Sequence, residues 1–242
     1  MYHATVVTLF PEMFPGALGF SIPGRAQDKG IWSLDTVQIR DFAVDKHQSV
    51  DDTPFGGGQG MVIRPDVVNN ALLKATSLSN ANRKILFTSP RGKPLTQEVL
   101  RKNLKEFPDG AIILCGRYEG IDQRVIDYWH QNHGLEEFSI GDYILSGGEI
   151  AAQVYLDSTI RLLPDALGAK ESSMEESFEL DLLEFFHYTR PHVWNGIAVP
   201  DVLLSGHHAN IKKWRHQQAE EITKALRPDM WETYLKKRKS AF

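Results

Sequence analysis

The sequence contains very little cysteine and no long apolar run. Cys115 is the single cysteine in 242 residues, so the chain cannot form an internal disulfide, and its position in the apolar run AIILCG is typical of a small core side chain. No stretch of about 18 consecutive apolar residues occurs, as a membrane-spanning helix would need. The N-terminal MYHATVVTLFPEMF lacks the basic segment and long apolar segment of an export signal. We therefore expect a reduced, cytoplasmic protein without membrane spans.

Two common phosphate-binding motifs are also missing. The sequence has no G-x-x-x-x-G-K-[ST], and no predicted strand is followed by a G-x-G-x-x-G that opens a helix. These absences argue against an ordinary kinase, an ATPase or a Rossmann dinucleotide enzyme. The chain has three other glycine-rich stretches instead, which are FGGGQGM (55–61), CGRYEG (115–120) and SIGDYILSGGE (139–149).

Strand-like and helix-like patterns alternate through residue 163. The predicted strands are ATVVTLF (4–10), LDTVQI (34–39), KILFTS (84–89), AIILCG (111–116) and EEFSI (136–140). Helical periodicity covers residues 66–77, 96–104, 121–131 and 149–163. This alternation is typical of an α/β fold in which helices cover a largely parallel sheet.

Three loops are expected to meet at one edge of that sheet. SPRG (89–92), CGRYEG and SIGDYILSGG each follow a predicted strand, and ligands of open α/β sheets bind beyond the carboxyl ends of the strands. Glycine allows the backbone to approach a ligand closely or to take a positive φ. The pattern favours a ligand pocket lined largely by main chain, although any one of these loops alone is equally well explained as a tight turn.

Charge is distributed unevenly along the chain. The net charge is −4, but residues 201–242 hold nine Lys/Arg against five Asp/Glu, a local balance of +4, which leaves −8 for the first 200 residues. A basic region beside an acidic body suits a phosphate-backbone partner, and solvated lysines that serve solubility are the alternative. Residues 164–181 are acidic and weakly periodic, whereas residues 208–226 and 229–239 have helical patterns. We predict an α/β domain at 1–163, a flexible acidic linker at 164–181 and a small all-helical domain at 182–242.

Five separated motifs resemble the bacterial tRNA (guanine-N1-)-methyltransferases of the TrmD family, which belong to the SPOUT class. They are DDTPFGGGQGM, LCGRYEGID, SIGDYILSGGE, HYTRP and LSGHH, in that order. The resemblance implies transfer of a methyl group from S-adenosylmethionine to N1 of guanosine-37 in tRNA by a homodimer with its active site at the subunit interface. It also implies a SPOUT-type parallel sheet with a deep C-terminal trefoil knot in the α/β domain. A Rossmann-like strand order is the alternative topology.

Methylation at N1 of guanine requires a base and benefits from a cation. N1 bears a proton that a carboxylate or histidine must remove, and negative charge then develops on O6, which a cationic donor stabilises. The resemblance assigns the cation to Arg161. It places Glu176 where the family has an aspartate, and Asp181 is the alternative base.

The resemblance also implies binding residues. For S-adenosylmethionine they are Phe87, Thr88, Ser89, Pro90, Gly116, Tyr118, Glu119, Gly120, Ser139, Ile140, Gly141, Asp142, Tyr143, Ile144, Leu145, Gly147 and Gly148. For tRNA they are Asp52, Gly57, Gly58, Gly60, Lys212, Lys213, Trp214 and Arg215. Trp214 suits a helix core equally well.

No resident metal site is expected. His207 and His208 have no cysteine or suitably spaced carboxylate nearby, and the sequence does not reveal whether Mg²⁺ assists. Two alternative functions are also compatible with the sequence. One is an RNA-binding protein of the same fold without catalysis, suggested by the change from Asp to Glu. The other is a SPOUT enzyme that methylates ribose, which would need no base for a ring nitrogen.

Overall fold

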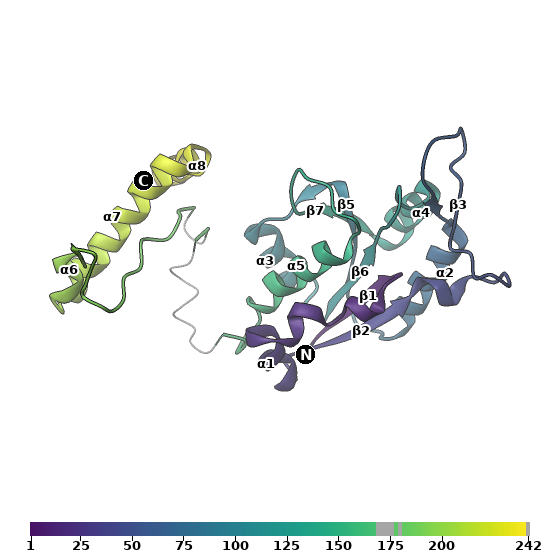
Figure 1. The fold of residues 1–242 in the computed structure, drawn as a ribbon, viewed down its shortest axis with the longest axis horizontal. Coiled ribbons are helices and arrows are strands. Elements are labelled where there is room, and N and C mark those ends of the chain that lie inside the picture. Colours follow the sequence, from purple (N-terminus) through teal and green to yellow (C-terminus); the bar gives the residue numbers. More distant parts are fainter. Residues whose placement is uncertain (168–176, 179–180, 241–242) are drawn as a thin grey trace. The chain divides into compact units, whose positions relative to one another are not determined.

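A computed structural model describes residues 1–167, 177–178 and 181–240 of the chain. The chain divides into two compact units, Met1–Gly168 and Ala169–Phe242, and the division falls inside the acidic segment 164–181. Figure 1 draws both units, and each is described by itself below. The proposed role of residues 164–181 as a linker stays a prediction.

The first unit is built around a five-stranded parallel sheet. The strand order is β2-β1-β6-β5-β7, and every neighbouring pair is parallel. The strands are β1 (Tyr2–Thr8), β2 (Trp32–Gln38), β5 (Lys84–Pro94), β6 (Gly110–Cys115) and β7 (Glu136–Ser139). The predicted α/β class with a parallel sheet is therefore confirmed. Because β6 is inserted between β1 and β5, the order differs from the 3-2-1-4-5-6 of a Rossmann fold; the trefoil knot stays a prediction.

Helices cover both faces of this sheet (Figure 1). They are α1 (Ser21–Asp28), α2 (Pro65–Ser77), α3 (Gln97–Glu106), α4 (Gln123–His133) and α5 (Glu149–Ile160), with short 3-10 turns at Pro11–Met13, Gly16–Gly19 and Ile39–Phe42. Along β6, Ile112 and Leu114 belong to the core cluster under α2 and α4, whereas Ile113 belongs to the cluster under α5. Both faces of each central strand are thus buried, which explains why these strands read as continuous apolar runs.

An irregularity in β5 shapes the carboxyl edge of the sheet. Thr88 and Lys93 both pair with Phe138 of β7, so residues 89–92 leave the ladder between them. A Cβ at Gly92 would overlap the backbone of Phe138. Glycine is therefore required where the two backbones meet, and the SPRG turn projects from the edge where the ligand pocket was predicted.

The second unit is mainly helical. It contains α6 (Asp201–Leu204), α7 (His208–Leu226) and α8 (Pro228–Ser240), and Ala219 and Ile222 of α7 are buried. A short antiparallel pair, β8 (Val193–Trp194) with β9 (Ile197–Ala198), precedes α6. The predicted all-helical composition is therefore wrong, because Asn195 and Gly196 both adopt positive φ and turn the chain back on itself. Among the described residues, no helix has the length and apolar character needed to cross a bilayer.

Candidate functional site

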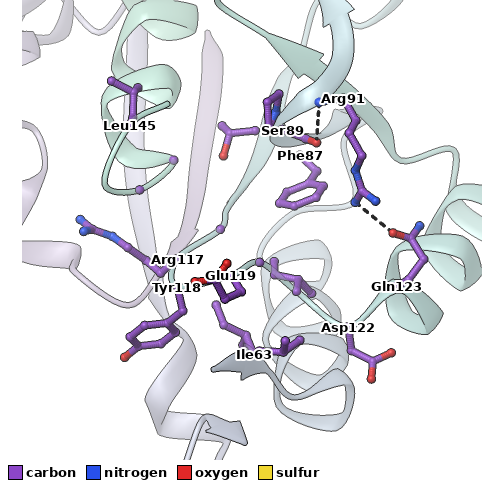
Figure 2. Close-up of a pocket in the computed structure, with 18 of the residues that line it drawn as sticks. Ile63, Phe87, Ser89, Arg91, Arg117, Tyr118, Glu119, Asp122, Gln123 and Leu145 are labelled. Carbon is purple, nitrogen blue, oxygen red and sulfur yellow. Dashed lines mark hydrogen bonds between the residues drawn. The ribbon is translucent and has the colours of Figure 1, made fainter. Parts of the chain in front are cut away.

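A large cavity lies at the carboxyl ends of β5, β6 and β7. Its volume is about 1310 Å³, and Figure 2 shows residues that line it. The lining includes every residue predicted to bind S-adenosylmethionine except Asp142, which is exposed and is not among the lining residues. Asp52, predicted for tRNA, also lines the cavity, while Gly57, Gly58 and Gly60 are exposed and do not. The structure thus gathers at one place three loops that are far apart in the sequence.

The loops after β6 and before α5 pack backbone against backbone. The Gly148 N–H donates to the Gly116 carbonyl at 2.9 Å. A Cβ at Gly148 would overlap the Thr88 hydroxyl and lie 3.0 Å from Cys115 Cα. Tyr118 has φ +58° and Gly120 has φ +121°, so the chain turns sharply here. The two loops are therefore joined through their main chains, and a lining made largely of main chain stays a prediction.

Cys115 lies behind these two loops and has no reactive character. Its side chain is fully buried, and burial, followed by the neighbouring Glu149 carboxylate, raises the pKa of its thiol well above the ordinary value. A protonated, inaccessible thiol is a poor nucleophile. The cavity therefore offers no covalent chemistry through cysteine.

A further wall comes from the hairpin of β3 (Asp51–Asp52) and β4 (Val62–Ile63). The Ile63 N–H donates to the Gly120 carbonyl at 2.9 Å, and the Asp122 N–H donates to the Ile63 carbonyl at 3.0 Å. Glu119 is tied in the same way, since its N–H donates to the Met61 carbonyl at 3.0 Å. The glycine-rich segment between β3 and β4 is thereby anchored beside the loop after β6.

Several residues that line the cavity were not among those predicted from the sequence. Arg91 donates to Gln123 Oε1 at 3.0 Å, which joins the SPRG turn to α4 (Figure 2). Arg117 and Ile63 also line the cavity. Arg91 and Arg117 lie inside two of the loops predicted to line the pocket, SPRG and CGRYEG, so an arginine within such a loop was the available signal. Ile63 carried none, because an apolar residue of a short strand reads as core.

Comparison with known proteins assigns the chain to a family. The family model described as "tRNA (Guanine-1)-methyltransferase TrmD" matches residues 2–233. The chain belongs to the TrmD family. It is 57% identical over 238 residues to the tRNA (guanine-N(1)-)-methyltransferases of Brucella ovis and Brucella melitensis biotype 1, which covers 98% of this chain and 95% of each relative. The Brucella suis enzyme is also 57% identical, with 93% of its length covered.

The structure describes only some of the residues that the TrmD resemblance assigns to catalysis. Arg161 caps the C-terminus of α5 and is partly buried, but it is not among the residues that line the cavity. Glu176 lies outside the described residues. Asp181 accepts a hydrogen bond from Lys237 Nζ at 2.9 Å in the second unit. The catalytic roles of Arg161 and Glu176 therefore stay predictions.

The expected TrmD tRNA contacts on α7 are only partly exposed. Lys212 and Lys213 are exposed. Trp214 is partly buried with its ring 6.2 Å from that of Tyr188, and the Arg215 guanidinium lies 4.7 Å from the centre of the Phe185 ring. Trp214 and Arg215 therefore also pack within the unit. No cluster of three or more metal-ligating side chains occurs among the described residues.

Proposed function

We propose that the protein transfers a methyl group from S-adenosylmethionine to N1 of guanosine-37 in tRNA. The observation that carries this proposal is the cavity at the ends of β5, β6 and β7, which is lined by nearly all the residues that the TrmD resemblance assigns to S-adenosylmethionine. The family match over residues 2–233 supports the same reaction. The alternatives are tRNA binding without catalysis and methylation of ribose.

The cavity is lined by glycine-rich loops and apolar side chains, which suits a sulfonium nucleoside without phosphates. The Phe87 ring packs closely against Gly116, where a Cβ would stand 3.2 Å from the ring edge. Ile140 and Leu145 add apolar surface. When bound, S-adenosylmethionine supplies an electrophilic methyl group on a sulfonium. The residues that would hold it are Phe87–Pro90, Gly116, Tyr118–Gly120, Ser139–Leu145, Gly147 and Gly148.

Methyl transfer to N1 requires the chain's own residues to remove the N1 proton and to stabilise the negative charge that develops on O6. We assign Glu176 to removal of the N1 proton, a step that contributes roughly 10²–10⁴-fold in comparable enzymes. We assign Arg161 to stabilisation of the negative charge on O6. Glu176 replaces the aspartate of the family and is one methylene longer. Asp181 is the weaker candidate, because its carboxylate already accepts from Lys237.

The finer architecture of the family completes the proposal. It comprises a deep trefoil knot at the three loops, a homodimer with the active site at the subunit interface, and a cytoplasmic location where tRNA is found. The unusual strand order, with β6 between β1 and β5, supports a topology other than a Rossmann fold. Dependence on Mg²⁺ is open to direct titration in the assay below.

The test is the identity of the methylated nucleoside. The protein is incubated with isotopically labelled S-adenosylmethionine and an unmodified tRNA transcript with guanosine at position 37, and the RNA is digested to nucleosides for mass spectrometry. We expect labelled 1-methylguanosine, which should vanish with a transcript that has adenosine at position 37. Unlabelled tRNA would indicate a binding module, and a label on ribose would indicate a 2′-O-methyltransferase.

The assignment of the base is tested separately. Glu176→Gln should abolish methyl transfer, because an amide does not accept the N1 proton, while S-adenosylmethionine binds as in the unmodified chain. Asp181→Asn provides the matched comparison and should retain transfer. Full turnover in Glu176→Gln together with loss in Asp181→Asn would move the base to Asp181.

A further inference from the structure

A fully buried carboxylate lies directly behind the cavity. Glu149, the first residue of α5, has no exposed surface. Its Oε1 accepts from the Thr8 hydroxyl at 2.7 Å, and its Oε2 accepts from Arg117 Nε at 2.9 Å. Arg117 lines the cavity, whereas Thr8 and Glu149 do not. The proposed reaction assigns no role to any of these three residues.

Arg117 connects segments that are distant in the sequence. Its Nη1 donates to the Ser146 carbonyl at 3.2 Å, and its guanidinium lies 4.3 Å from the centre of the Phe10 ring. Gly147 leaves the space that the side chain occupies, because a Cβ there would overlap Arg117 Nε. One arginine thereby ties the loop after β6, the loop before α5 and the segment after β1.

The anchor of this tie is Glu149. A buried carboxylate needs charge or hydrogen-bond partners on both oxygens, and these partners are Thr8 at the end of β1 and Arg117 in the cavity wall. The opposite charges of Arg117 and Glu149 also offset each other, so a cationic sulfonium would meet no net charge from this pair. The contacts of Glu149 with Thr8 and Arg117 therefore set the distance between the loop after β6 and the loop before α5, which both face the ligand.

We propose that Glu149 is a positioning residue for the methyl-donor site. By bridging the Thr8 hydroxyl and the Arg117 guanidinium, it keeps the 116–120 and 144–148 loops at the spacing that S-adenosylmethionine requires. This inference rests on the proposed function only in the choice of ligand. It predicts that affinity for the ligand depends on a carboxylate that does not line the cavity.

The first test is Glu149→Gln, measured by isothermal titration calorimetry with S-adenosylmethionine and with its neutral product S-adenosylhomocysteine. We expect both dissociation constants to rise by about tenfold or more, because misplaced loops weaken either ligand. The KM for S-adenosylmethionine should rise with them, while kcat at saturation stays within about threefold of the original value.

The matched control is Glu136→Gln. Glu136 also pairs with a buried cation, since it accepts from Lys84, which is 7% exposed, but it stands at the start of β7 and does not line the cavity. This variant should lose thermal stability without any loss of ligand affinity. If Glu136→Gln and Glu149→Gln lost the same ligand affinity, Glu149 would have only a general structural role. That result would overturn the proposal.

A second pair of variants covers the case in which Glu149→Gln does not fold. Thr8→Val removes the hydroxyl that donates to Glu149 and accepts from the Phe10 N–H, and Thr8→Ser keeps it. We expect weaker ligand binding in Thr8→Val and rescue to the original affinity in Thr8→Ser. Unchanged affinity in Thr8→Val would contradict the proposal, whereas an unmodified chain that binds neither ligand would reject the proposed function and this inference together.

Discussion

At the scale of single residues, the cavity depends on three glycines, because their lack of a side chain makes room for neighbouring groups. Gly116, Gly147 and Gly148 stand where a Cβ would meet Phe87, Arg117 and Thr88 respectively. Gly116 and Gly148 contact strand β5 and Gly147 contacts the loop after β6, so the glycines permit these segments to pack closely together. This differs from the role of glycine in an isolated turn, where only a positive φ is needed.

Gly148→Ala tests this role of glycine. The added methyl would overlap the Thr88 hydroxyl and crowd Cys115, so we expect a destabilisation of about 1–3 kcal/mol and a loss of S-adenosylmethionine affinity of at least about tenfold. Calorimetric titration and thermal unfolding measure the two effects.

Gly134→Ala is the control for that substitution. Gly134 has φ +68° at the C-terminus of α4, with open space around it, so alanine should cost about 1 kcal/mol of backbone strain and leave ligand affinity unchanged. A normal affinity in Gly148→Ala would show that the loops tolerate a wider spacing.

Arg161→Ala tests the proposed cation. Loss of a donor to O6 should reduce kcat by roughly 10²-fold while the dissociation constant of S-adenosylmethionine changes little. Arg25→Ala, which removes an exposed arginine from the last turn of α1, should leave both quantities unchanged. Equal losses of rate and cofactor affinity in Arg161→Ala would indicate a structural role at the end of α5.

At the scale of elements, Lys212 and Lys213 of α7 differ from Trp214 in their surroundings. Lys212 and Lys213 are exposed, whereas Trp214 is partly buried beside Tyr188. The helix therefore uses part of its circumference for packing and leaves its lysines to solvent. Such lysines are suited to contacts with the RNA phosphates, which contribute affinity but do not distinguish one base sequence from another.

The double variant Lys212→Ala/Lys213→Ala should weaken tRNA binding by about tenfold and reduce the slope of log K against log salt by about one per lost phosphate contact. Filter binding over a salt series measures both values. Lys102→Ala, which removes another exposed lysine, is the matched control in α3. A full slope in the double variant would place the phosphate contacts elsewhere.

At the scale of the whole molecule, the two units have separate cores. Both large apolar clusters are formed by residues of the first unit alone. The second unit has its own buried contacts, since the Leu183 N–H donates to Thr223 Oγ1 at 2.8 Å and Leu182 is buried. We therefore expect ligand binding in the cavity to be independent of the core of the second unit.

A chain truncated after residue 168 tests this independence. We expect it to fold and to bind S-adenosylmethionine within about threefold of the full chain, because every residue that lines the cavity belongs to the first unit. Its tRNA affinity should fall by more than about tenfold, because α7 is lost. Calorimetry and filter binding give the two constants, and undiminished tRNA affinity would exclude the second unit as the main RNA contact.

Local patterns were enough to predict most elements of the fold. Each predicted strand of the sheet overlaps an observed one, and the helical periods at 66–77 and 149–163 match α2 and α5 closely, because burial of both sheet faces imposes the apolar runs directly. The hairpin of β8 and β9 was missed, since two-residue strands are too short to show a period. The motifs also indicated the residues of the cavity through their resemblance to the family.

The sequence by itself therefore determined the α/β class, the family and the three loops of the pocket. Only the tertiary structure decided the strand order and the link from Thr8 through Glu149 to Arg117, whose members lie 141 and 32 residues apart. Secondary structure follows from interactions between near neighbours along the chain. A buried charge, in contrast, is stabilised by whichever partners the fold brings to it, and no local pattern specifies them.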